Sequence, residues 1–113
     1  MGLYSELPVY KACYNLLLET YMFTRNFTKE YKYTIGETLK KETVNLLTLI
    51  FRANSKKDKF KTLQEAREHI EVIRLFIRIL KDLKQISLKS FVRINQQVEE
   101  VSKQLTGWQK SLK

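Results

Sequence analysis

Glycine, proline and cysteine are scarce in this chain of 113 residues, with three, one and one copies respectively. A β-sandwich or an α/β fold of this length needs many tight turns and would normally use more glycine and proline. The single cysteine, Cys13, excludes a disulfide within the chain and a metal cage built on cysteines. The composition favours an all-α fold, and the length predicts one domain over residues 1–113.

Long apolar runs are also missing. No run approaches the ~18 residues that a helix needs to span a bilayer. The first six residues, Met-Gly-Leu-Tyr-Ser-Glu, have neither a basic head nor an apolar signal core. We therefore expect a cytoplasmic protein without a membrane role.

Acidic residues are outnumbered, because 12 Asp and Glu stand against 21 Lys and Arg to give a net charge of +9. Positive charge of this size on a small domain indicates a polyanionic partner such as RNA or DNA. The alternative is a charged surface that only keeps the protein in solution.

Apolar residues recur at helical spacing in four segments of about twenty residues each. These predicted helices span about 7–26, 34–54, 62–85 and 88–112. Because the connections between them are short, they predict an up-down-up-down antiparallel four-helix bundle.

Helix starts have their own sequence signals. Thr34 with Glu37, and Thr62 with Glu65, have the spacing of capping boxes. In a capping box the threonine side chain accepts the backbone N–H of the glutamate, and the glutamate side chain accepts the backbone N–H of the threonine. Ser87 is the expected N-cap of the last helix.

The third predicted helix has an unusually wide apolar arc, about 220° on a wheel of about 100° per residue. Its members are Ile70, Val72, Ile73, Leu75, Phe76, Ile77, Ile79, Leu80 and Leu83. A helix at the edge of a bundle needs a stripe of only about 100° or somewhat more to cover its core. The excess favours a subunit interface. The alternative is a central helix that packs against all three neighbours.

The narrow remaining face of this helix carries four cations within about 60° of one another. They are Arg67, Arg74, Arg78 and Lys81. Arginine suits a bidentate grip on phosphate or carboxylate, so this stripe is a candidate for nucleic-acid or partner binding. The alternative is a ladder of Arg67–Glu71 and Arg78–Asp82 pairs, in which Arg74 and Lys81 have weaker claims to partners.

Residues 54–61 predict a loop that holds the densest cluster of cations. The cluster consists of Lys56, Lys57, Lys59 and Lys61. Such a loop can clamp a phosphate backbone, which demands positive charge but no particular geometry. A solvated loop is the equal alternative.

The link before the second helix places Phe27, Tyr31 and Tyr33 among the cations Arg25, Lys29 and Lys32. Aromatic rings beside cations stack the bases of single strands. More often, such rings fold back and cap the end of a core.

Residues for catalysis or metal binding are not apparent. The sequence has no glycine-rich phosphate loop, no nucleophile with a placed base and no Glu-x-x-His pair of the di-iron bundles. His69 is the only histidine, so a metal site is not expected. We expect neither an enzyme nor a cofactor.

Several motifs resemble one family of small bacterial four-helix bundles. They are Leu7-Pro8-Val9-Tyr10-Lys11, Phe27-Thr28-Lys29-Glu30-Tyr31-Lys32-Tyr33-Thr34-Ile35-Gly36-Glu37, Ile73-Arg74-Leu75-Phe76-Ile77-Arg78-Ile79-Leu80 and Leu105-Thr106-Gly107-Trp108. The chain resembles the accessory variability determinant (Avd) of diversity-generating retroelements, and more distantly the proteins encoded in ribosomal RNA intervening sequences. The resemblance covers about residues 7–110.

The resemblance implies a homopentameric barrel with a positively charged exterior. Avd proteins bind nucleic acid and the reverse transcriptase of the retroelement, and they support the mutagenic copying of a template RNA into cDNA. By position, Arg74 and Arg78 match two arginines of the family's third helix. The expected partners are therefore a nucleic acid, which is RNA, DNA or an RNA–cDNA hybrid, and a reverse transcriptase. The alternative is an oligomeric protein–protein scaffold unconnected with a retroelement.

Overall fold

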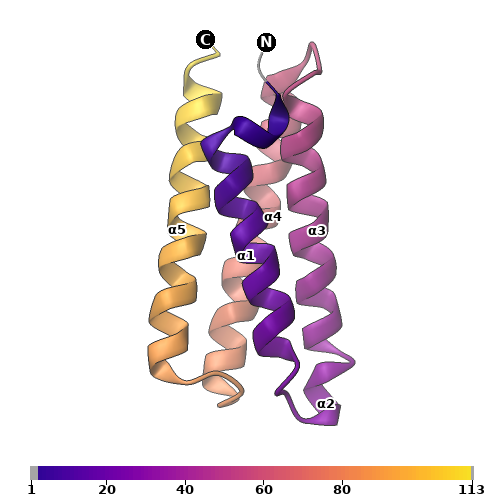
Figure 1. Cartoon of the computed structure of the whole chain (residues 1–113), viewed down its shortest axis with the longest axis vertical. Helices are drawn as coiled ribbons and strands as arrows, with labels where there is room; N and C mark the ends of the chain where they lie inside the picture. Colours follow the sequence, from indigo (N-terminus) through magenta and orange to yellow (C-terminus); the bar gives the residue numbers. More distant parts are fainter. Residues whose placement is uncertain (1–2, 113) are drawn as a thin grey trace.

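Four long helices make up most of the computed structural model, which describes residues 3–112. They are α1 (Pro8–Thr24), α3 (Ile35–Ala53), α4 (Lys59–Asp82) and α5 (Leu88–Lys110). A 3-10 turn, η1 (Tyr4–Glu6), precedes α1, and the one-turn helix α2 (Lys29–Lys32) precedes α3. The described part of the chain contains no strand. The long helices run alternately down and up, which confirms the predicted four-helix bundle (Figure 1).

The helices form a rod of 43 × 22 × 21 Å. α1 packs against α3 and α5, and α4 packs against the same two helices from the opposite side (Figure 1). α1 and α4 therefore lie on a diagonal, and no other helix of residues 3–112 covers the outer side of α4. This arrangement contradicts the alternative of a central third helix. A bundle of four gives each helix only two close neighbours.

The core is a column of aliphatic side chains contributed by all four helices. The largest fully buried ones are Leu16, Leu39, Leu46, Ile50, Leu63, Ile70, Ile73, Ile77, Leu80, Ile94, Val98 and Leu105. Each stabilises the fold by about 1.5–3 kcal/mol relative to an exposed position. None of the described helices is long and apolar enough to cross a membrane.

The start of α4 differs from its prediction. Oδ1 of Asp58 accepts the backbone N–H of Lys61 at 3.2 Å, so Asp58 is the N-cap and α4 begins at Lys59. Thr62 lies inside the helix, where its hydroxyl donates to the Asp58 carbonyl. The predicted capping box at Thr62 is therefore wrong. Aspartate caps at least as well as threonine, and it extends the helix by almost one turn.

The capping box at Thr34 is also wrong, because α2 ends directly before it. The Thr34 hydroxyl donates to the Glu30 carbonyl at 2.6 Å and caps no N–H of α3. Only the prediction for α5 is confirmed, where Ser87 Oγ accepts the Ser90 N–H at 3.1 Å.

The aromatic residues of the link between α1 and α3 divide into two groups. Phe27 is buried and Tyr31 packs against the core, so these two fold back and cap it. A Cβ added to Gly36 would lie 3.0 Å from the Tyr31 carbonyl oxygen and 3.3 Å from the Phe27 ring. The link is therefore pressed closely onto the first turn of α3. Tyr33 alone remains outside.

Candidate nucleic-acid interface

Three of the four cations predicted as one stripe on α4 contact α5, namely Arg67, Arg74 and Lys81. Arg67, at the upper end, donates from Nη1 to Oε1 of Gln109. Gln109 is only 3% exposed, and its Nε2 donates to the Phe60 carbonyl at 3.2 Å and to Gln64 Oε1 at 2.9 Å. Arg67 thus belongs to a network within the bundle, and it makes no ion pair with Glu71.

Arg74 is held by two carboxylates. Its Nη1 lies 2.6 Å from Oε2 of Glu71, and its Nη2 lies 2.8 Å from Oε2 of Glu99 on α5. Partial burial alone would lower the pKa of Arg74, but hydrogen bonds and charge from Glu71 and Glu99 outweigh it and raise the pKa. The guanidinium is therefore firmly charged. A phosphate would have to displace one of these carboxylates, contrary to the expectation that Arg74 has a weak claim to partners.

Arg78 and Lys81 are engaged more weakly. The Arg78–Asp82 pair was expected and is present, but Nε and Oδ2 are 3.6 Å apart and the Arg78 side chain is 66% exposed. Lys81 places Nζ 5.0 Å from the ring centroid of Phe91 on α5. Arg78 is thus the only exposed member of the predicted stripe, and the other three are half-buried.

The four lysines predicted to clamp a phosphate backbone differ in their exposure and contacts. Lys56 and Lys57 are exposed in the connection, and Lys61 is exposed on the first turn of α4. Lys59 instead folds back, and its Nζ donates to the carbonyls of Ala53 (2.9 Å), Asn54 (3.1 Å) and Lys56 (3.0 Å). Lys59 therefore caps the end of α3 and is not free to hold a phosphate.

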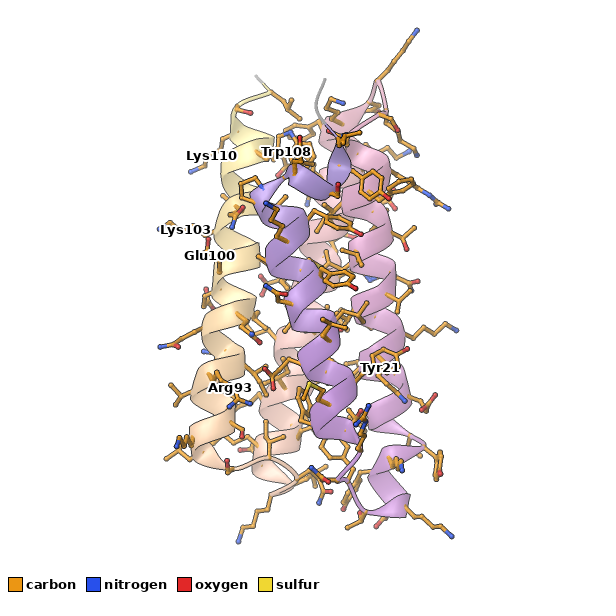
Figure 2. All side chains as sticks on the ribbon, viewed as in Figure 1. Tyr21, Arg93, Glu100, Lys103, Trp108 and Lys110 are labelled. Atoms are coloured by element: carbon orange, nitrogen blue, oxygen red, sulfur yellow. The ribbon has the colours of Figure 1, made fainter. Side chains whose placement is uncertain are left out.

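The two predicted groups do not form a single site. Lys61 and Lys81 lie at opposite ends of α4, which at a rise of about 1.5 Å per residue puts them roughly 30 Å apart. Exposed cations are therefore distributed along the molecule. Lys110, for example, extends outward from α5 (Figure 2). The arrangement suits a long polyanion rather than a small ligand.

Two exposed apolar faces accompany the charge. The outer side of α4 exposes Val72, Leu75 and Leu83, with Leu75 56% exposed. These residues belong to the wide apolar arc that the sequence showed.

The second apolar face was missed, because only one stripe was sought on α1. It exposes Tyr14, Leu18, Tyr21 and Met22. Their spacing of three or four residues was the signal that could have revealed it. Tyr21 points to α3 (Figure 2), where Lys40 Nζ lies 5.0 Å from its ring centroid.

The upper part of this α1 face is an aromatic cluster. The Tyr4 ring packs edge-on against Tyr10 and Phe51, at centroid distances of 5.1 and 4.6 Å. Tyr10 stacks on Tyr14 at 6.1 Å. A groove of about 460 Å³ beside them is lined by Ser5, Tyr10, Lys11, Tyr14 and Asn15.

The environments of Cys13 and His69 indicate roles in the stability of the fold. Burial raises the pKa of the Cys13 thiol to about 12, so the reactive thiolate is disfavoured. Nδ1 of His69 lies 2.6 Å from Oε1 of Glu42, which links α4 to α3.

Comparison with known proteins identifies the family. No curated protein matches the chain. The sequence profile of a family described as bAvd-like matches residues 9–112, which covers all four long helices and both ends of the bundle. The chain therefore belongs to the bAvd-like family.

Proposed function

We propose that this protein is a non-catalytic, nucleic-acid-binding accessory protein that partners a retroelement reverse transcriptase and supports the copying of template RNA in mutagenic retrohoming. Membership of the bAvd-like family supports the accessory role. The observation that carries nucleic-acid binding is the net charge of +9. Among the lysines and arginines of residues 3–112, only Lys40, Arg74, Arg78 and Arg93 pair with a carboxylate, so most of the positive charge is left for a partner.

The distribution of charge supports binding to the backbone of the nucleic acid. The exposed cations Lys56, Lys57 and Lys61 lie at one end of α4, and Arg78 lies near the other. Contacts to phosphates require positive charge along a strand and carry no base sequence. We therefore expect weak sequence selectivity and affinity that falls steeply with salt.

We further propose that the chain assembles into a homopentamer. The exposed apolar faces lie on the diagonal helices α1 and α4, so one face of a copy can pack on the other face of the next copy. Such head-to-tail contacts generate a ring when the rotation closes. The number five comes from the family resemblance.

Arg78 is the preferred contact for the reverse transcriptase, since its guanidinium is exposed and only loosely paired. Neighbouring genes give the first test, because a reverse transcriptase gene and paired repeats should lie nearby. The cDNA yield of that enzyme should rise when this protein is added. It should rise less with Arg78→Ala, whereas Lys103→Ala on the outer side of α5 should match the wild type. An unchanged cDNA yield with the wild-type protein would contradict the partnership.

The second candidate is an oligomeric protein–protein scaffold. The two apolar faces and the neutralised Arg74 favour it, because both suit contacts with protein. A scaffold predicts little affinity for RNA at low salt and a protein partner that is lost with Arg78→Ala. The two functions are thus separated by RNA binding alone.

A further inference from the structure

Two connections that are distant in the sequence meet at the lower end of the bundle in Figure 1. The backbone N–H of Thr28 donates to Oε1 of Gln85 at 3.2 Å. The Gln85 amide also donates from Nε2 to the Leu83 carbonyl at 3.3 Å, within its own turn. This bridge joins the link before α3 (residues 25–34) to the connection before α5 (residues 83–87), so both segments and the first turn of α5 lie at one end of the bundle.

Five cations of this surface form no ion pair among residues 3–112. They are Arg25, Lys29, Lys32, Lys84 and Lys89, and we call them the basic end. All are exposed except Lys32, which is half-buried. The nearby acidic residues in the sequence are Glu30, Glu37 and Asp82, of which Glu37 already pairs with Lys40 and Asp82 with Arg78. The basic end therefore keeps an excess of positive charge that phosphates can neutralise.

Lys84 occupies a backbone position that ordinarily selects glycine. Its φ is 60°. The hydrogen bonds from Lys84 N–H to the Lys81 carbonyl (3.0 Å) and from Gln85 N–H to the Leu80 carbonyl (2.9 Å) are those of a Schellman motif at the end of α4. Glycine is usual there because a Cβ is unfavourable in the left-handed region. A lysine at this site strains the backbone while it adds a cation to the basic end.

Tyr33 supplies an aromatic surface beside these cations. Its side chain is 62% exposed, whereas Phe27 of the same link is 6% exposed. Lys32 Nζ lies 5.7 Å from the Tyr33 ring centroid. An exposed ring among cations is the arrangement on which unpaired bases stack. Bases within a duplex have no free face to offer, so this feature selects a single strand.

The link that carries part of the basic end is packed against the core of the bundle. Phe27 is buried beneath the link, and Gly36 lets the Tyr31 carbonyl approach the first turn of α3 closely. The surface is therefore ordered before any ligand arrives, which lowers the entropy lost on binding.

We propose that the basic end binds single-stranded nucleic acid, with backbone phosphates on Arg25, Lys29, Lys84 and Lys89 and one base stacked on Tyr33. This rests on the proposed nucleic-acid-binding function and adds selectivity for unpaired strands. The exposed cations at the two ends of α4, Lys56, Lys57 and Lys61 at one end and Arg78 near the other, contact phosphates of paired and unpaired strands alike. A molecule with both surfaces can hold a template where it changes from paired to unpaired.

The stacking contact is tested by anisotropy with the full chain, on fluorescein-labelled oligouridylate and on an RNA hairpin of the same length whose loop is a non-nucleotide linker, so that the hairpin has no unpaired bases. Tyr33→Ala should weaken oligouridylate binding about fivefold or more. It should leave hairpin binding unchanged, and Tyr33→Phe should restore oligouridylate binding. Equal oligouridylate affinity in the wild type and Tyr33→Ala would overturn the inference.

The cationic contact is tested with Lys84→Gly, because glycine suits the backbone at this position. The thermal midpoint should stay the same or rise, so weaker binding cannot be attributed to unfolding. The slope of log affinity against log salt for oligouridylate should become shallower by about 0.7, the value of one lost phosphate contact. The matched control Lys103→Gln, on the outer side of α5, should leave the slope unchanged. An unchanged slope in Lys84→Gly would overturn the role of Lys84.

The wild-type protein separates this inference from the proposed function. If it binds the hairpin but not oligouridylate, the basic end is not a single-strand site, while the proposed function stands. If it binds neither RNA at low salt, both are overturned, and an acidic protein becomes the partner to seek for the basic end.

Discussion

Lys59 shows at the scale of single residues why a cluster of lysines in a sequence is not a cluster in space. Four lysines within six residues predicted a uniform cationic loop. In the structure, Asp58 caps α4, and the first helical turn carries Lys59 back to the end of α3. Its ammonium group donates to two carbonyls at the end of α3, those of Ala53 and Asn54, and to the Lys56 carbonyl in the connection. Lys59 therefore caps a helix, whereas Lys57, two residues away, is exposed to solvent.

Lys59→Ala should lower the free energy of unfolding by about 1 kcal/mol, because the carbonyls at the end of α3 lose a charged donor. Lys57→Ala, two residues away and exposed, should change it by less than about 0.5 kcal/mol. Urea denaturation of both variants measures the difference. Equal stabilities of the two variants would contradict the capping role of Lys59.

Cys13 gives a prediction for pH dependence. Its pKa is raised from 9.0 to about 12 in the folded chain by burial, so the unfolded chain loses the thiol proton first as pH rises. The contribution to stability is complete below pH 9 and is lost between pH 9 and 12. Relative to Cys13→Ala, the wild type should lose about 1.4 kcal/mol per pH unit in that window. Urea denaturation measures the free energy of unfolding of both proteins. If the difference between them stayed constant from pH 9 to 12, the raised pKa of Cys13 would be contradicted.

At the scale of the elements, the sequence predicted each long helix but not each helix end. Apolar periodicity reports the buried face, which the core confirms. The first residue of a helix depends on which of several nearby side chains caps it, as with Asp58 and Thr62 at α4. It also depends on whether another helix lies just before it in the chain, as α2 lies before Thr34. The sequence predicted that the four cations of α4 share one face of the helix, but it did not predict their partners, most of which lie on α5. Spacing within one helix does not reveal that Arg74 meets Glu99.

Ser87→Ala and Asp58→Ala should each destabilise the fold by about 1 kcal/mol, since each removes a side chain that caps a long helix. Thermal unfolding measures both. Thr34→Ala is the matched comparison, and it should cost less because Thr34 caps no N–H of α3. If all three variants had the same midpoint as the wild type, the assignment of the caps would be wrong.

At the scale of the whole molecule, charge and apolar area are arranged for different partners. The wide arc of the third predicted helix indicated a surplus of apolar area, and the structure leaves that surplus on the outer side of α4. The opposite face on α1 escaped prediction, because only one stripe was sought on that helix. The sequence did place Tyr33 among Arg25, Lys29 and Lys32, but Lys84 and Lys89 were not joined to them, since only the fold brings residue 28 to residue 85.

The assembly is tested by placing a charge on the outer face of α4. Leu75 is 56% exposed in the isolated chain, so Leu75→Glu should leave the folded helix content unchanged. It should convert the oligomer to smaller species if the face is an interface. Leu88→Glu, at the more exposed Leu88 on the first turn of α5, is the matched control and should remain oligomeric. Light scattering after gel filtration distinguishes the two results.

Binding of a structured RNA to the wild-type protein, followed by fluorescence anisotropy at several salt concentrations, tests the central claim most directly. The proposed nucleic-acid function predicts micromolar or tighter affinity at low salt. If four cations contact phosphates, log affinity should fall against log salt with a slope of about −3 to −4. Absence of binding at low salt would contradict the function, and affinity independent of salt would contradict recognition through the phosphate backbone.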